Sequence, residues 1–187
     1  MEKVKEFCNC IRQRSIEHKI AFQRITDLPS IMASIIRQEL DSMVRVIYLL
    51  SISDLHERNK LIKQTIDGNK WTIKTQKGKQ RHITDREMVE LANRLQGWTK
   101  SVYKFGCAFI HLSSHHAYNI KNPLESISKA EKEDIISHMR SYHGGPNSDS
   151  PSFEELAAYF PRVFEKITDN LDCYIKELEQ LNITNNE

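Results

Sequence analysis

Apolar residues recur at three- and four-residue steps along most of this chain, which is the period of helices that bury one face. The clearest case begins at Thr84, where Thr84 and Glu87 form a capping box of the type that starts a helix. The apolar positions that follow form one face: Met88, Leu91, Leu95, Trp98, Val102, Phe105, Phe109 and Leu112. This spacing predicts one long helix from Thr84 to Tyr118.

The same period predicts helices on both sides of this segment. They are expected at about residues 3–25, 30–53, 55–66 and 128–143, after Ser152, and from Pro161 onward. Segment 30–53 is apolar around much of its circumference, so we expect it to be the central, buried helix. Residues 71–83 alternate and contain a Lys77-Gly78 turn, which predicts a small β-hairpin or extended loop. The predicted fold class is all-α, a bundle of five to six helices with this basic insertion, in a single domain spanning residues 1–187.

Composition describes an ordinary globular chain, since 39% of its 187 residues are apolar and 28% are charged. No apolar run approaches the roughly 20 residues of a membrane-spanning helix, and the charged N-terminus lacks the apolar region of a signal peptide. We therefore expect a cytoplasmic protein with no membrane contact. None of the four cysteines forms a Cys-x-x-Cys pair, which argues against a zinc knuckle. Cys8 and Cys10 point about 200° apart on a helix, so we interpret them as unreactive.

The net charge of +2 conceals an uneven distribution. Residues 58–82 contain eight Lys or Arg and one acid, a balance of +7, whereas residues 165–187 contain six acids and two bases, a balance of −4. A basic segment of this density is suited to nucleic-acid phosphate. The alternative is a solvated lysine-rich hairpin that faces the acidic end of the same chain or of a second subunit.

A second, polar stripe runs along the predicted long helix. Lys100, Lys104, His111, His115 and Tyr118 follow one another at helical spacing, on a face other than the apolar one. Cations and imidazoles on adjacent turns are suited to holding phosphate, placing a proton or binding a metal ion. The unperturbed pKa of histidine, about 6.5, allows proton transfer near neutral pH. We expect Lys104 and His111 to form the active part of this stripe.

The order of the helices, and the sequence Phe-Ile-His-Leu-Ser at residues 109–113 on a polar-faced helix, resemble the HEPN superfamily of small helical bundles. The resemblance is closest to its stand-alone members from plasmids and defence loci. It implies a homodimer in which two helices with an Arg-x(4–6)-His motif form a shared cleft that cuts RNA without a metal ion. His111 matches the motif histidine. Lys104 replaces the arginine, and it is a point charge without the bidentate geometry of a guanidinium group.

The resemblance implies an RNA-binding protein or a metal-independent endoribonuclease, acting as a toxin or defence component without a cofactor. The expected catalytic residues are Lys104 and His111. The expected RNA contacts are Lys100, His115, Lys74, Lys77, Lys79 and Arg81. The expected partners are RNA, an antitoxin or defence protein, and a second copy of the chain, because a long helix with two distinct faces can pair isologously with its copy.

Two other functions fit the same residues. In the first, the polar stripe is the dimer interface of a non-catalytic interaction module with this fold. In the second, the bundle is a metal-dependent hydrolase. His111 and His115, at positions i and i+4, would then hold a metal ion with a third ligand from His56, His138 or Glu39.

Two further sets of charged residues allow both a functional and a structural interpretation. Arg12 and His18 match the HEPN spacing literally, but they lie on the first helix, so we interpret the match as coincidence. The central helix is interrupted by four charged residues: Arg37, Glu39, Asp41 and Arg45. We favour i,i+4 ion pairs such as Asp41 with Arg45 over a place in the polar cleft.

Overall fold

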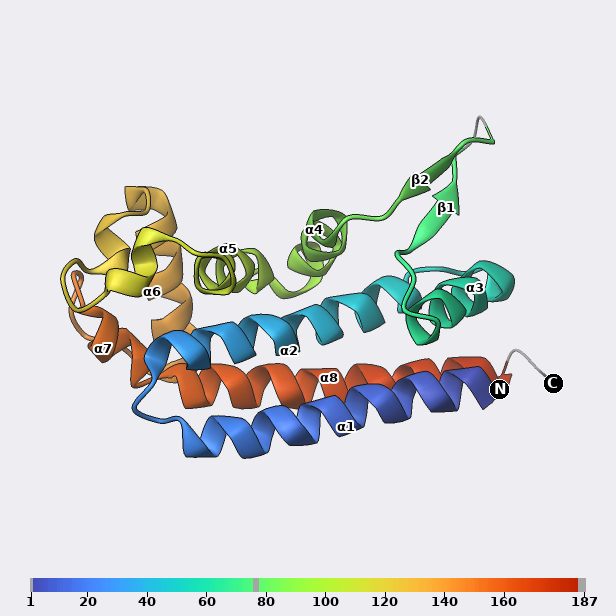
Figure 1. The fold of residues 1–187 in the computed structure, drawn as a ribbon, viewed down its shortest axis with the longest axis horizontal. Coiled ribbons are helices and arrows are strands. Elements are labelled where there is room, and N and C mark those ends of the chain that lie inside the picture. Colours follow the sequence, from blue (N-terminus) through green and yellow to red (C-terminus); the bar gives the residue numbers. More distant parts are fainter. Residues whose placement is uncertain (1, 76–77, 185–187) are drawn as a thin grey trace.

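The computed structural model describes residues 2–75 and 78–184 and is an all-α bundle with one small β-hairpin (Figure 1). Its elements are α1 (Glu2–Arg24), α2 (Pro29–Leu50), α3 (Leu55–Ile66), β1 (Thr72–Lys74), β2 (Gln80–His82), α4 (Asp85–Gln96), α5 (Thr99–Ile110), the short 3-10 helices η1 (Ser114–Ala117) and η2 (Pro123–Glu125), α6 (Lys129–His143), α7 (Phe153–Ala157) and α8 (Phe160–Thr184). None of the helices in this described part of the chain is long and apolar enough to cross a bilayer.

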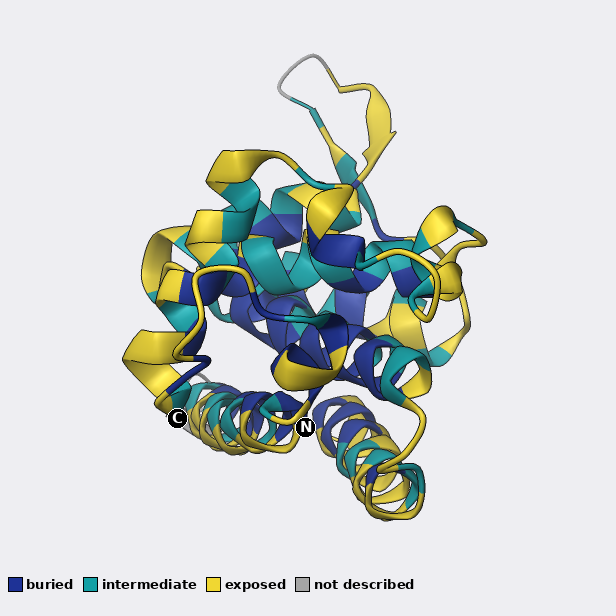
Figure 2. Cartoon of the chain, turned by 90° about the vertical axis from the view of Figure 1, so that its left-hand side faces the viewer, coloured by how far each residue is buried: buried dark blue, intermediate teal, exposed yellow. Residues whose placement is uncertain are grey.

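The long helices α1, α2 and α8 run side by side along the molecule, and α4 and α5 cross α2 on the side away from α1 and α8 (Figure 1). The hairpin projects beyond α3 and α4 on that same side, whereas α6 and α7 close the opposite end. Viewed from that end, buried residues gather in the middle of the bundle and the hairpin is mostly exposed (Figure 2). Both ends of the described chain lie at the α3 end of the molecule (Figure 1).

The prediction that the second helix is central is confirmed. More than half of the residues of α2 are buried, and Leu40, Met43, Val44, Val46 and Leu49 have no exposed surface. The helix is covered on one side by α1 and α8 and on the other by α4 and α5. Pro29 occupies its first turn, where a missing backbone N–H costs nothing.

The prediction of one long helix from Thr84 to Tyr118 is wrong. Its start is confirmed, because Thr84 and Glu87 form both bonds of the capping box. The helix then ends at Gly97, which adopts a φ of 77° that glycine reaches at little cost. A second helix, α5, follows and ends at Ile110.

This break also corrects the predicted apolar face. Leu95 and Leu112 were expected on it, but they are 66% and 96% exposed, since each lies at or beyond a helix end. The side chain of Asn93 links the two helices, because its Oδ1 accepts the backbone N–H of Lys100 at 3.1 Å.

Polar contacts join α1 to its neighbours. Arg12 donates two hydrogen bonds of 2.7 Å to the carboxylate of Glu179 on α8. The carboxylate of Glu39 on α2 is almost fully buried and accepts from Ser15 Oγ at 2.5 Å and pairs with His18 Nδ1 at 2.6 Å. Arg12 and His18 therefore tie α1 to two different helices, which supports the interpretation of their spacing as coincidence.

The charged residues of α2 form ion pairs, but not the expected one. Asp41 pairs with Arg37, one turn before it, and Arg45 pairs with Asp85 at the start of α4, with an N···O distance of 3.1 Å. The predicted Asp41–Arg45 pair is wrong because tertiary packing brings Asp85 within reach of Arg45.

The predicted hairpin is confirmed as two short antiparallel strands. Thr72 lies opposite His82, Ile73 opposite Arg81, and Lys74 opposite Gln80. Trp71, just before β1, is buried and donates its ring N–H to Thr65 Oγ1 at 2.7 Å. The base of the hairpin is therefore anchored to α3, while its strands extend away from the bundle (Figure 1).

Helices α2 and α5 approach closely at Gly106. A Cβ atom on this residue would lie 2.6 Å from Cβ of Arg37, which is closer than side-chain atoms normally approach. Arg37 is only 3% exposed. Its guanidinium lies 3.9 Å from the ring centre of Tyr103 and donates from Nε to Cys107 Sγ at 3.4 Å. The absence of a side chain at 106 thus lets a buried cation contact α5.

We predict that Gly106→Ala destabilises the protein by up to about 2 kcal/mol. Alanine favours a helix over glycine by about 1 kcal/mol, but overpacking typically costs about 1–3 kcal/mol, and Cβ of Arg37 cannot move away without moving α2. Urea unfolding of the full chain measures the change, and Ala130→Gly at an exposed position of α6 calibrates the helix-propensity contribution. A Gly106→Ala variant more stable than the native chain would contradict the close contact.

Candidate functional site

The predicted polar stripe borders a cleft of about 680 Å³ between α5, η1 and the first turns of α6. Its walls are largely apolar: Tyr103, Phe105, Ala108, Ile127, Ala130 and Ile135. Its polar lining comes from Lys100, Ser101, Lys104, Cys107, His115, Glu131 and Asp134. A concave apolar surface with a few polar groups is typical of binding sites. The structure therefore brings three of the predicted residues together, namely Lys100, Lys104 and His115.

Lys104 does not present a free charge to this cleft. Its Nζ lies 2.6 Å from Oε1 of Glu131 on α6, while Oε2 of Glu131 accepts from the hydroxyl and the backbone N–H of Ser128. The hydrogen bond from Lys104, together with those from Ser128, lowers the pKa of Glu131 to about 2. Glu131 is therefore ionised at neutral pH, and a phosphate would have to compete with it for Lys104.

Asp134, one turn further along α6, is the second carboxylate of the cleft. Its Oδ2 accepts a hydrogen bond from Ser101 on α5, and its Oδ1 lies 3.5 Å from Nδ1 of His138. The Asp134 side chain is 52% exposed. The two carboxylates balance the two lysines, so the cleft has no net positive charge from these four groups.

His115 reaches the cleft from η1. Its ring packs edge-on against Phe105 and Phe109, and its Nε2 is buried without a hydrogen-bond partner. Burial lowers the pKa of His115, and the nearby His116 lowers it further. Both effects favour the neutral form of the imidazole at neutral pH.

His111 is separated from this group of residues. It follows the last residue of α5 with an extended backbone, is exposed, and does not belong to the cleft lining. Because the helix ends before it, His111 and His115 lack the i,i+4 geometry expected for a shared metal ion. Among the described residues, no three His, Cys, Asp or Glu side chains lie close enough together to hold a metal ion.

The wall formed by Tyr103 and Cys107 lies against the buried guanidinium of Arg37. Desolvation raises the pKa of the Tyr103 hydroxyl. The pairing of Arg37 with Asp41 neutralises the cation behind the wall. Arg37 thus fixes the cleft wall, and the expectation that the charges of α2 are structural rather than cleft-lining agrees with its position.

The four cysteines are free in the structure. Cys8 is buried and Cys10 exposed, as their expected directions on a helix require. Burial raises the pKa of the Cys8 thiol to about 12, so this group stays protonated.

The basic segment 58–82 exposes fewer free cations than its sequence suggests. Arg58 is buried and donates from Nε to the carbonyl oxygens of Leu49 and Ile52, each at 3.2 Å, so it caps the end of α2. Arg81 pairs with Glu87 at 2.6 Å. Lys60 and Lys63 also pair with carboxylates of their own helix or its end.

The remaining hairpin lysines are available for a ligand. Lys70, Lys74 and Lys79 are exposed, and within residues 2–75 and 78–184 no carboxylate pairs with them. The predicted contact Lys77 lies outside the described residues. Lys74 and Lys79 on the projecting hairpin therefore carry charges that no carboxylate of the described residues neutralises.

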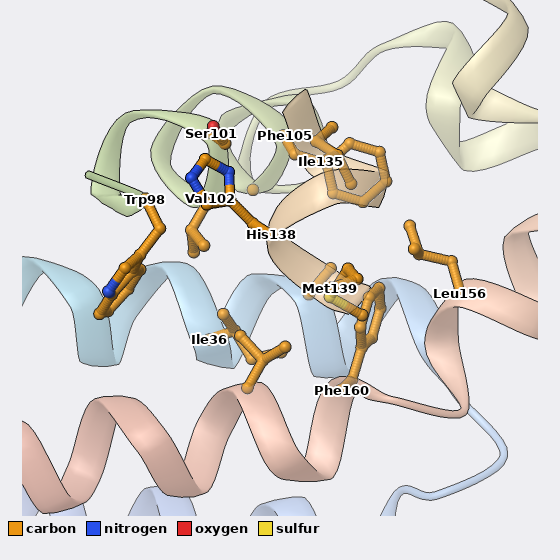
Figure 3. Close-up of a pocket in the computed structure, with 13 residues that line it drawn as sticks. Ile36, Trp98, Ser101, Val102, Phe105, Ile135, His138, Met139, Leu156 and Phe160 are labelled. Atoms are coloured by element: carbon orange, nitrogen blue, oxygen red, sulfur yellow. The ribbon is translucent and has the colours of Figure 1, made fainter. Parts of the chain in front are cut away.

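A smaller apolar cavity of about 60 Å³ lies beneath the cleft, between α2, α5, α6 and α8 (Figure 3). Ser101, Phe105 and Ile135 line both spaces. Figure 3 shows Ser101 and His138 at one edge of it, above Ile36, Met139 and Phe160.

The sequence analysis missed the two carboxylates that balance the positive charge of the cleft, Glu131 and Asp134. Glu131 was readable as a helix-capping residue, because Ser128-x-x-Glu131 is a capping box. Its contact with Lys104 was not readable, since the two residues meet only through the packing of α6 on α5. The same holds for Asp134 beside Ser101.

A scan against protein-family models, a search of curated proteins and a search of solved structures each found no match to this chain. The HEPN resemblance therefore stays a prediction that is based on the helix order and on residues 103–118.

We predict that Lys104→Met raises the pKa of Glu131 from about 2 toward its ordinary value of 4.5, but not fully, because the Ser128 hydrogen bonds remain. Carboxyl-detected NMR measures this pKa directly. Because the pKa in the folded state lies below the unfolded value, the pair stabilises the native chain above about pH 4.5, and this contribution disappears as the pH falls toward 2. An unchanged Glu131 pKa in Lys104→Met would contradict the ion pair.

Proposed function

We propose that this chain is an RNA-binding protein with a HEPN-like bundle, in which the hairpin supplies the electrostatic attraction and the α5–α6 cleft receives part of the RNA. The observation that carries this proposal is that the exposed cations without a carboxylate partner in the described hairpin, Lys74 and Lys79, stand on an element that projects from the bundle. Unpaired lysines on a projecting ribbon can approach phosphates without first breaking an ion pair.

The positions of the hairpin and the cleft fit one extended ligand. The hairpin, α4 and α5 all lie on the side of α2 away from α1 and α8 (Figure 1). Arg86 and Arg94 are exposed on α4 between them, although Arg86 pairs with Glu90. A single strand can therefore run from the hairpin across α4 to the cleft on one side of the molecule.

Cleavage by Lys104 and His111 has less support within one subunit. The ammonium group of Lys104 forms an ion pair with Glu131, and His111 lies outside the cleft lining. The HEPN resemblance implies that residues of two subunits together form the cleft that cuts RNA. The expected homodimer stays a prediction, and it would bury the highly exposed Leu112 and Ile120 if the 111–120 segment formed its interface.

We expect the double substitution Lys74→Ala/Lys79→Ala to weaken binding of single-stranded RNA and to make it less sensitive to salt. Each lysine that no longer neutralises a phosphate reduces the slope of log affinity against log salt by about 0.7. Fluorescence anisotropy across a salt series measures both quantities. The matched control is Lys5→Ala/Lys19→Ala, which removes the same charge from exposed positions of α1 on the opposite side. Equal effects of the two double substitutions, or no RNA binding by the native chain, would refute the proposal.

We expect the native chain and His111→Ala to show no difference in RNA cleavage in EDTA under conditions that keep the chain monomeric. The reason is the separation of His111 from the cleft in one subunit. Gel analysis of a labelled RNA after incubation gives the measurement. EDTA-resistant cleavage that His111→Ala abolishes and Lys104→Arg preserves would instead assign catalysis to this pair.

A further inference from the structure

The α5–α6 cleft has the features of a base-binding site rather than of a phosphate site. Its lysines are balanced by carboxylates, so it adds little net attraction for phosphate. Its walls are apolar and include the aromatic ring of Tyr103, which packs against the buried Arg37. Bases of single-stranded RNA are commonly held by stacking on aromatic rings and by hydrogen bonds to their Watson–Crick edges.

Among the polar groups of the cleft, Asp134 has the most free capacity to accept hydrogen bonds. Both oxygens of Glu131 are engaged, by Lys104 and by Ser128. Oδ2 of Asp134 accepts only from Ser101, and Oδ1 has only the 3.5 Å contact to His138. Ser101 therefore orients a half-exposed carboxylate that can still accept two further donors.

We propose that the cleft binds one unstacked RNA base and prefers guanine, with Asp134 as the residue that determines this preference. Guanine is the standard RNA base with two adjacent donors, N1–H and N2–H, on its Watson–Crick edge, and these match the two oxygens of a carboxylate. Uracil presents one donor between two carbonyl oxygens. Adenine and cytosine place a ring-nitrogen acceptor beside their amino group. A carboxylate repels each of these acceptors, because it cannot donate a hydrogen bond.

The inference is based on the proposed RNA binding and assigns separate roles to two places: the hairpin lysines attract phosphates, and the cleft selects the base.

The test uses the full chain and short labelled oligouridines that carry a single guanosine, inosine, adenosine or uridine at the centre. Anisotropy titrations at one fixed salt concentration give the affinities. We expect the guanosine oligomer to bind about tenfold more tightly than the uridine oligomer. Inosine, which lacks the N2 amino group, should fall between them.

Matched substitutions on α6 assign the preference to one residue. Asp134→Asn should remove the preference for guanosine. Glu133→Gln makes the same change of charge at the preceding residue, which does not line the cleft, and should keep the preference. Ala130→Trp, at an exposed position of the cleft wall, should also remove the preference by filling the space. Thermal melts followed by circular dichroism confirm that each variant is folded.

The outcomes separate the two proposals. Salt-sensitive RNA binding with equal affinity for guanosine and uridine overturns the base preference and leaves the proposed function standing. A guanosine preference that survives Asp134→Asn in a folded protein overturns the role of Asp134. Failure to bind any of the oligomers overturns RNA binding and the base preference together.

Discussion

The close approach of α5 to the central helix α2 is the constraint on which the rest of the structure depends. Gly106 permits it, because any side chain there would meet Cβ of Arg37. Arg37 in turn fixes Tyr103 and Cys107, which form one wall of the cleft. The guanidinium tolerates burial because Asp41 neutralises it and an aromatic ring covers it. The cleft is thus held by the core of the bundle rather than by a surface loop.

The pairing of charges, more than their number, decides what each surface can bind. The sequence carries a dense basic segment and a stripe of lysines, and both suggest phosphate. In the structure Lys104 and Arg81 are each held by a carboxylate, and Arg58 is buried as a cap for α2. Lys74 and Lys79 keep their charge exposed on the projecting hairpin. In the proposed function, this division places the attraction for RNA phosphates on the hairpin and the selection of a base in the cleft.

The fold could be predicted from the sequence because local signals were strong. The apolar period, the capping boxes at Thr84, Ser128 and Ser152, and the apolar circumference of the second helix each correspond to an observed element. The break at Gly97 was missed because the apolar period continues through it, and a single glycine within a helical pattern is compatible with either outcome. The predicted role of His111 depended on its place on a helix face, and His111 lies just beyond the end of α5 instead.

The site was predictable only in part, for a different physical reason. Lys100, Lys104 and His115 do reach one cleft. The carboxylates that set its charge come from α6, about thirty residues later, and no local pattern pairs Lys104 with Glu131 or Ser101 with Asp134. The neutral state of His115 also follows from burial against Phe105 and Phe109, which requires the tertiary structure.

Photo-crosslinking with residue-level mass spectrometry tests the central claim most directly. An oligouridine with one central 6-thioguanosine would be irradiated with the native chain, and the cross-linked peptides identified. The account predicts that the thioguanosine attaches within α5 or the first turns of α6, near Tyr103 and Asp134. Thiouridines placed toward one end of the oligomer should attach to the hairpin around Lys74 and Lys79. Cross-links confined to α1 and α8, on the opposite side of α2, would contradict it.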